Sequence, residues 1–379
     1  MAKNSKLFPT KAKKERVVLA SVNINGHRSL WSHKESLLEL GNLTSAVGGE
    51  VVFKISQNLK KPNHTYLGSG KLEELSNIAD FDTLICDDEL TPTQQRNLET
   101  TLNGKKVLDR TALILDVFAT RAQTSEGRLQ VELAQNEYLL PRLQGQWSHL
   151  ERLGGGIGTR GPGETQIETD RRLLRNRISK IKSKIEDVRR HRNIYQNKRI
   201  SEGIPVATLV GYTNAGKSTF MNALTNANVI AENKPFSTLD TVTRQITLKS
   251  QRKILISDTV GLIQKLPSSL IAAFRATLEE INLSKILIHV IDITDPKAPA
   301  QWEVAHKTFK DIGISGKPTI VALNKIDKYE SSTGTVDMDQ FENMPTNFVY
   351  TSALKKIGFE ELLLKIDSKL NNQLKCSYK

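Results

Sequence analysis

Four short polar motifs, each placed after an apolar run, hold the residues whose types and spacing suggest chemistry. The first fits the pattern Gly-x4-Gly-Lys-Ser and comprises Gly211, Tyr212, Thr213, Asn214, Ala215, Gly216, Lys217 and Ser218. Its glycines allow backbone N–H groups to surround phosphate oxygens, and the helix that follows adds positive dipole. In such a loop the lysine reaches the β- and γ-phosphates, and the serine hydroxyl ligates Mg²⁺. The alternative is a glycine-rich turn without a ligand.

The second motif fits Asp-x-x-Gly and ends a predicted strand. It comprises Asp258, Thr259, Val260 and Gly261. The aspartate would hold a Mg²⁺-bound water, and the N–H of Gly261 would face a γ-phosphate oxygen. Lys217 and Gly261 are therefore the expected catalytic groups. Ras-type enzymes place a water-orienting glutamine at the next position. Here it is Leu262, whose apolar side chain cannot orient water, so we expect slow intrinsic hydrolysis.

The third and fourth motifs indicate which base is bound. They comprise Asn324, Lys325, Ile326 and Asp327, then Ser352, Ala353 and Leu354 after the last predicted strand. An aspartate carboxylate at this place accepts from N1–H and the 2-amino group of guanine together, a donor pair that adenine lacks. The fourth motif would give the base a backbone N–H. The four motifs together predict a protein that binds GTP and hydrolyses it to GDP and phosphate.

Strands and helices alternate at both ends of the chain, which predicts an α/β fold. The C-terminal strands are expected at 206–211, 245–249, 253–257, 285–292, 318–324 and 347–351, forming a doubly wound, mostly parallel sheet of a P-loop GTPase domain. A smaller α/β layer precedes it, with strands at 17–24, 50–55, 82–87 and 105–109. Within that layer, a Gly-x-Gly-Lys at 68–71 lacks the rest of a nucleotide fingerprint, and we predict a turn there. Cys86 and His289 are expected in the cores.

Two apolar seams between these layers predict an antiparallel helical hairpin. The first seam consists of Leu129, Leu133, Asn136, Leu140, Leu143, Trp147 and Leu150, and the second of Leu174, Ile178, Ile181, Ile185 and Val188. Pro141 should kink or split the first arm. The expected organisation is a basic disordered tail (1–16), an N-terminal α/β domain (17–110), the hairpin with a Gly-rich loop at 154–164 (111–203), and the GTPase domain with a C-terminal helix (204–379).

The charge of the 379-residue chain is concentrated in two short segments. The net charge is +13; residues 1–16 contribute +5 and residues 165–200 contribute +8. Such clustering is typical of a polyanion partner, nucleic acid first, with a solvated tail and helix face as the alternative. Two cysteines exclude a disulfide scaffold and a four-cysteine metal site. Neither a membrane-spanning segment nor an apolar signal region is evident, so we expect a cytoplasmic protein.

These motifs resemble those of the HflX GTPases, in the translation-factor-related class that includes Era, Obg and the TrmE type. The resemblance covers nearly all of the chain after Val17. Its most specific segments are GSGKLEEL, DRTALILDVFATRAQTSEGRLQVELAQNEYLLPRL, GGGIGTRGPGE and DTVGLIQKLPSSLIAAFRATLEE. The family's switch I motif, Phe-Ala-Thr-Leu-Asp, corresponds to Phe236, Ser237, Thr238, Leu239 and Asp240. Ser237 stands in the place of the alanine.

The resemblance also implies ligands for two cations. It assigns Thr238 as the second Mg²⁺ ligand beside Ser218, with Asp258 acting through water. Chemistry alone leaves this choice open, since Thr241 and Thr243 are close in sequence. Asn214 stands where related GTPases hold a potassium ion, a positive charge set against the transition state. The alternative is that Asn214 only caps the loop.

The HflX family binds the large (50S) ribosomal subunit and is implicated in splitting or rescuing stalled ribosomes. The resemblance therefore implies that the Gly-rich loop and the basic helix contact rRNA, whereas spacing alone favours a plain linker. The residues expected at the RNA are Gly154, Gly155, Gly156, Arg160, Arg171, Arg172, Arg175, Lys182, Arg189 and Arg190.

We expect a monomeric, Mg²⁺-dependent GTPase that acts on the large ribosomal subunit in splitting or rescue, protein synthesis or ribosome biogenesis. GTP would order the switches and hydrolysis would time release. One alternative is a tRNA-modification GTPase, although the switch region lacks a cysteine for that chemistry. Another is a regulatory switch at a protein or membrane surface, with peripheral membrane association through the basic segments.

Overall fold

The computed structural model divides into two compact units, Met1–Ile114 and Leu115–Lys379. The structure describes residues 14–24, 31–78, 80–143, 162–201, 203–225, 235–236, 241–265, 281–311, 313–314, 316–329 and 348–377. For residues 162–165, 193, 195–201 and 373–377 within these ranges, the structure describes the backbone alone. No helix in this part of the chain is long and apolar enough to cross a membrane.

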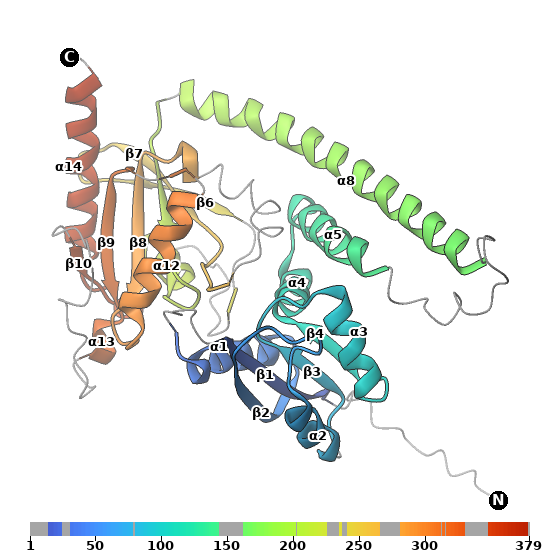
Figure 1. Ribbon diagram of the computed structural model, residues 1–379. Coiled ribbons are helices and arrows are strands. Elements are labelled where there is room, and N and C mark those ends of the chain that lie inside the picture. The colour runs from blue at the N-terminus through green and yellow to red at the C-terminus, as the bar shows by residue number, and fades with distance from the viewer. Residues whose placement is uncertain are drawn as a thin grey trace, which may run out of the picture. The chain divides into compact units, whose positions relative to one another are not determined.

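The first unit is a four-stranded parallel sheet flanked by helices, in the strand order β2-β1-β3-β4 (Figure 1). Its elements are β1 (Arg16–Ile24), α1 (His33–Ala46), β2 (Glu50–Leu59), α2 (Ser69–Asn77), β3 (Thr83–Cys86), α3 (Pro92–Thr101) and β4 (Lys106–Asp109). Capping boxes define two helix starts, because Ser32 and Thr91 each pair with the residue three positions later. Cys86 lies in the core, as expected.

The Gly-x-Gly-Lys segment of this unit begins a helix. Gly68 is the N-cap of α2, and the ammonium of Lys71 pairs with the carboxylate of Glu74 at 2.6 Å. Residues 69–71 therefore form the first turn of helix α2, where we predicted a turn outside a helix.

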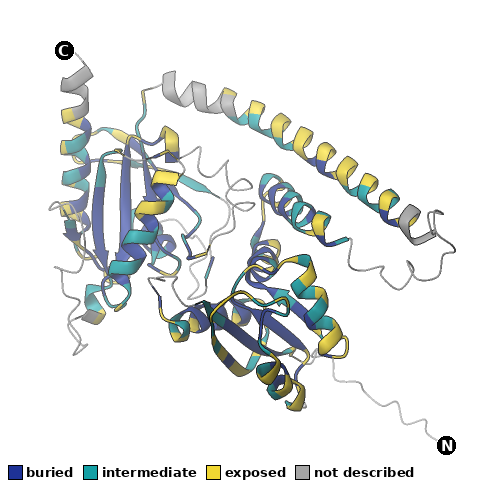
Figure 2. Ribbon diagram, viewed as in Figure 1, coloured by how far each residue is buried: buried dark blue, intermediate teal, exposed yellow. Residues whose placement is uncertain are grey.

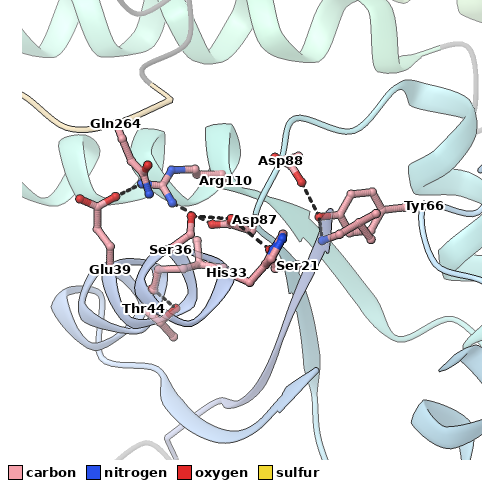
Figure 3. Close-up of polar contacts among 12 residues, drawn as sticks. Ser21, His33, Ser36, Glu39, Thr44, Tyr66, Asp87, Asp88, Arg110 and Gln264 are labelled. Atoms are coloured by element: carbon pink, nitrogen blue, oxygen red, sulfur yellow. Dashed lines mark hydrogen bonds and ion pairs between the residues drawn. The ribbon is translucent and has the colours of Figure 1, made fainter. Parts of the chain in front are cut away.

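A buried ion-pair cluster lies at the carboxyl end of the first sheet (Figure 3). The Arg110 guanidinium, which is almost fully buried, donates to the carboxylates of Asp87 (2.8 Å) and Glu39. The Ser36 hydroxyl donates to the other oxygen of Asp87 at 2.6 Å. A buried carboxylate needs such partners because its desolvation costs several kcal/mol. The cluster thus joins α1, β3 and the residue that begins α4.

The helical part contains α4 (Arg110–Arg121), α5 (Ser125–Leu139), a 3₁₀ turn η1 (Leu140–Arg142) and α8 (Pro162–Ser201). α5 packs on α8 (Figure 1), with Ile178 and Ile181 buried. Helix α5 ends one residue before the turn that contains Pro141, as a proline inside a helix predicts. One expectation was wrong: residues 162–164 belong to α8 and not to the Gly-rich loop, because a proline suits the first position of a helix. The rest of that loop, Trp147 and Leu150 lie outside the described residues.

The remainder of the second unit is a six-stranded sheet in the order β10-β9-β8-β5-β7-β6, covered by helices on both faces (Figure 1). Its elements are β5 (Val206–Val210), α9 (Lys217–Thr225), β6 (Val242–Thr247), β7 (Lys253–Asp258), β8 (Ile286–Asp292), α12 (Ala298–Asp311), β9 (Thr319–Asn324), α13 (Ile326–Tyr329), β10 (Phe348–Tyr350) and α14 (Phe359–Ser377). All strand pairs are parallel except β6–β7. This is the predicted α/β fold.

The edge strand β6 begins three residues before the predicted strand at 245–249 and ends two residues earlier. Its antiparallel register pairs Val242 with Asp258 and Thr247 with Lys253. Leu248 then begins the turn, because its N–H donates to the carbonyl of Arg252. The apolar run alone could not show this boundary, since it depends on where the partner strand ends.

Candidate functional site

The motif at 211–218 forms the connection between β5, a central strand, and α9. Gly216 has φ +94°, and a Cβ there would lie 2.6 Å from the side-chain nitrogen of Asn324, so only glycine fits without strain. Asn214 also has a left-handed backbone, with φ +64°. The loop is therefore shaped by close contacts with the loop that follows β9, and its residues lie where the sequence predicts.

The Lys217 side chain is folded back into the loop. Its ammonium donates to the carbonyls of Gly211 (3.1 Å) and Tyr212 (2.8 Å) and is buried. Burial lowers the pKa of Lys217 to about 8, while the nearby negative charge of Asp258 opposes the shift. An ammonium held by two neutral carbonyls in a buried place would gain strongly from an anionic partner.

Oxygen ligands for a divalent cation meet where β7 ends and α9 begins. The Ser218 hydroxyl donates to the carboxylate of Asp258 at 3.1 Å, and both side chains are buried. A hydroxyl and a carboxylate are hard ligands of the kind that Mg²⁺ prefers. The described residues contain no cluster of three or more histidine, cysteine or acidic side chains that could hold a metal by themselves. The donor set thus fits a cation that is shared with a bound anion.

The segment after β7 is bonded to the first half of the loop. The N–H of Thr213 donates to the carbonyl of Leu262 (2.8 Å), and the N–H of Leu262 donates to the carbonyl of Gly211 (3.0 Å). Gly261 approaches so closely that a Cβ on it would lie 3.0 Å from the ammonium nitrogen of Lys217. Gly261 and Lys217, which the motifs predict as catalytic groups, are therefore adjacent.

Polar side chains at the end of β9 and in the segments after β9 and β10 form the other end of the site. The Asn324 amide donates to the carbonyl of Ala215 (2.9 Å), and its oxygen accepts from the N–H of Ala353 (3.0 Å). The Ser352 hydroxyl donates to a carboxylate oxygen of Asp327 at 2.6 Å. The third and fourth motifs are thus brought together and tied to the first.

Asp292, at the end of β8, belongs to this site, and the sequence motifs did not include it. Its carboxylate pairs with the Lys325 ammonium at 2.6 Å, and the same ammonium donates to the carbonyl of Asn214 at 2.9 Å. The sequence signal was available, because Asp292 ends an apolar strand in the same way as Asp258 and Asn324.

Of the switch I residues, only Phe236 is described. It is buried with φ +55°, and its ring meets that of Phe118 edge-on, with 4.5 Å between centroids. Ser237, Thr238, Leu239 and Asp240 lie outside the described residues. Of the two alternative threonines, Thr243 lies in β6, where its hydroxyl contacts that of Ser257 at 3.1 Å.

The basic residues predicted at RNA fall into two groups along α8, whose outer face is exposed (Figure 2). Three are paired: Lys182 with Glu137 of α5, and Arg189 and Arg190 each with an acidic residue three positions earlier. Within the described part of the chain, no ion pair involves Arg171, Arg172 or Arg175. Gly154, Gly155, Gly156 and Arg160 lie outside the described residues.

Comparison with known proteins agrees with this geometry. Models of protein families match residues 34–119 (GTP-binding GTPase N-terminal), 121–199 (GTP-binding GTPase Middle Region) and 206–325 (50S ribosome-binding GTPase). The sheet order and the loop after β5 define the second unit's sheet as a P-loop GTPase domain, and the chain is a GTPase.

Two relatives that are more than 40% identical over most of this chain show the family. A GTPase HflX of Caldanaerobacter subterraneus is 46% identical over 361 residues, which cover 94% of this chain and 81% of the relative. That of Escherichia coli is 43% identical over 344 residues, covering 90% of this chain and 80% of the relative. A solved GTP-binding protein of Sulfolobus solfataricus in complex with GDP is 27% identical, covering 94% of this chain and 99% of its own, with a TM-score of 0.47. The chain belongs to the HflX family of GTPases.

Proposed function

We propose that this GTPase binds the large ribosomal subunit when it holds GTP, and that hydrolysis times its release during ribosome splitting or rescue. The proposal rests on one observation: the same chain carries nucleotide loops bonded to one another and a long helix on which the exposed Arg172 and Arg175 have no ion pair among the described residues. The family model for 206–325, described as a 50S ribosome-binding GTPase, supports it. This role implies a cytoplasmic protein with rRNA phosphates as partner.

The phosphates of GTP would lie in the loop at 211–218. The Lys217 ammonium would donate to the β- and γ-phosphates in place of the two carbonyls. Burial disfavours the charged form of this lysine, and the negative charge of the phosphates would stabilise that form. Mg²⁺ would be held by Ser218, by Thr238 and, through water, by Asp258, and it would neutralise charge on the phosphate oxygens. Phe236 and its neighbours in switch I would order around this ion.

The guanine would lie between the third and fourth motifs. Asp327 would accept from N1–H and the 2-amino group, with its carboxylate oriented by the Ser352 hydroxyl. The N–H groups of Ser352 and Ala353 are already donated to Ile357 and Asn324. Leu354 is therefore the candidate for the backbone donor to the base.

Hydrolysis would depend on charge stabilisation more than on a positioned base. Leu262 offers no side-chain group to water, and its backbone is held against Gly211 and Thr213. The N–H of Gly261 and the ammonium of Lys217 would stabilise the γ-phosphate in the transition state. A potassium ion at Asn214 would add to this, and ordering of the switches by the ribosome would complete the site.

The experiment is pelleting of the protein with isolated 50S subunits in the presence of a non-hydrolysable GTP analogue. Arg172 and Arg175, both exposed, are changed together to Glu. The matched control changes Lys307 and Lys310, exposed on α12, to Glu, which alters the net charge equally. We expect the α8 variant to bind at least about tenfold more weakly, and raised salt to weaken the wild type. Equal binding by the two variants would contradict the RNA-contact role of α8.

A further inference from the structure

Strand pairing places the end of β8 beside the third motif. In the β8–β9 ladder Asp292 is the register partner of Asn324, and the next N–H, that of Ile293, donates to the carbonyl of Asn324 at 3.1 Å. Lys325 follows with φ +69°, a left-handed conformation that a lysine rarely adopts. This conformation turns the Lys325 side chain back toward β8.

The two carboxylate oxygens of Asp292 have separate partners. One accepts from both the N–H (3.0 Å) and the hydroxyl (2.7 Å) of Thr294, so the carboxylate orientation is fixed by its own turn. The other receives the Lys325 ammonium at 2.6 Å, and both side chains are mostly buried, 14% and 22% exposed. A charged hydrogen bond in such a place is among the stronger single interactions in proteins.

The same ammonium donates to the carbonyl of Asn214 at 2.9 Å. A continuous path therefore runs from Thr294 through Asp292 and Lys325 to the phosphate loop. Without the carboxylate, the ammonium would have only a neutral carbonyl and water as partners, and its four-carbon stem would regain its rotational freedom. The contact between Asn214 and Lys325, both left-handed, would then depend on that one hydrogen bond from a more mobile side chain.

We propose that Asp292 is a positioning residue for guanine nucleotide binding, which holds the phosphate loop and the base-binding loop at the spacing of one nucleotide. The inference rests on the proposed placement of GTP between these loops. The path joins the two loops through protein atoms alone, so its loss should weaken nucleotide binding without altering the reacting groups at Lys217 and Gly261.

The test compares Asp292→Asn with Asp295→Asn. Asp295 lies in the same turn and accepts from the N–H of Lys297 and the side chain of Gln301, so the control makes the same chemical change away from the loops. Binding and dissociation of fluorescently labelled GDP are measured, together with kcat and KM for GTP. We expect Asp292→Asn to raise Kd and KM about tenfold, with kcat within about twofold, and Asp295→Asn to match the wild type.

Two further variants separate positioning from general damage. In a Lys325→Met background, Asp292→Asn should have no additional effect, because both act through one ion pair. If Asp292→Asn does not fold, Thr294→Val replaces it and should raise the Kd about threefold. Equal losses from Asp292→Asn and Asp295→Asn, additive losses in the Lys325→Met background, or a fall in kcat alone would overturn the inference. Unchanged GDP binding by Lys217→Ala would instead overturn the proposed nucleotide site.

Discussion

His289 is a buried imidazole in β8, and its neutral form should make the second unit sensitive to mild acid. It is 2% exposed and stacks on Trp302 of α12 with ring centroids 4.9 Å apart. Burial lowers its pKa to about 3, with smaller contributions from the positive charges of His306 and Lys217. No hydrogen-bond partner for its Nδ1 is present in the described structure. Protonation would therefore place an unpaired cation in the core.

The size of the effect follows from the two pKa values. An unfolded histidine has a pKa of about 6.5. Between that value and about 3, the unfolded chain binds a proton that the folded unit does not, so stability is full above pH 6.5 and falls as the pH is lowered. Between pH 7.5 and pH 5 the free energy of unfolding should fall by about 2 kcal/mol from this group alone.

The assay is urea unfolding followed by Trp302 fluorescence, with Trp31 and Trp147 replaced by Phe so that the signal reports this unit. Wild-type and His289→Phe proteins are compared at pH 7.5 and pH 5, because all other titrating groups are common to both. We expect the wild type to lose about 2 kcal/mol more than the variant. His191→Asn, which removes an exposed imidazole of α8, serves as the control and should behave like the wild type. Equal losses in wild type and His289→Phe would refute the reasoning.

Three further predictions concern binding, stability and rate. Asp327→Asn should weaken GTP binding roughly a hundredfold or more and favour xanthosine nucleotides, since an amide can accept from N1–H and donate to the 2-carbonyl of xanthine. Competition binding measures this preference, and an unchanged preference for GTP would contradict the assignment. Arg110→Met should lower the free energy of unfolding of the first unit by about 3–5 kcal/mol, because the carboxylate of Asp87 stays buried without its cation. The rate of amide hydrogen exchange in β3 should rise, and an exchange rate equal to that of the wild type would contradict this prediction. GTP hydrolysis should be faster in potassium than in sodium salts if Asn214 helps to hold the ion, and equal rates would rule this out.

The sequence predicted those parts of the site that depend on strand ends. Because parallel strands carry their carboxyl ends to one edge, polar residues after apolar runs placed the loop at 211–218, Asp258 and Asn324 correctly. Asp292 ends its strand in the same way but lacked a recognisable motif, and its partner Lys325 is 33 residues away in the chain. Only the strand register shows that the two meet.

The charge pattern predicted less of the RNA-binding surface than the motifs predicted of the nucleotide site, because a count of charges does not show which of them are paired. The excess on residues 165–200 indicated a basic helix, yet Lys182 is neutralised by Glu137 of α5. Arg110 is fully buried between two carboxylates that lie 71 and 23 residues earlier in the sequence. Such pairings arise from tertiary packing, which neither composition nor local spacing encodes.

The central claim, that GTP controls binding to the large ribosomal subunit, is tested most directly by pelleting the wild-type protein with isolated 50S and 30S subunits. The protein is loaded with either a non-hydrolysable GTP analogue or GDP. The proposed function predicts that it sediments with 50S subunits in the analogue state, is released in the GDP state, and leaves 30S subunits unbound in both. Binding to 50S that is equal in the two nucleotide states, or absent in both, would contradict it.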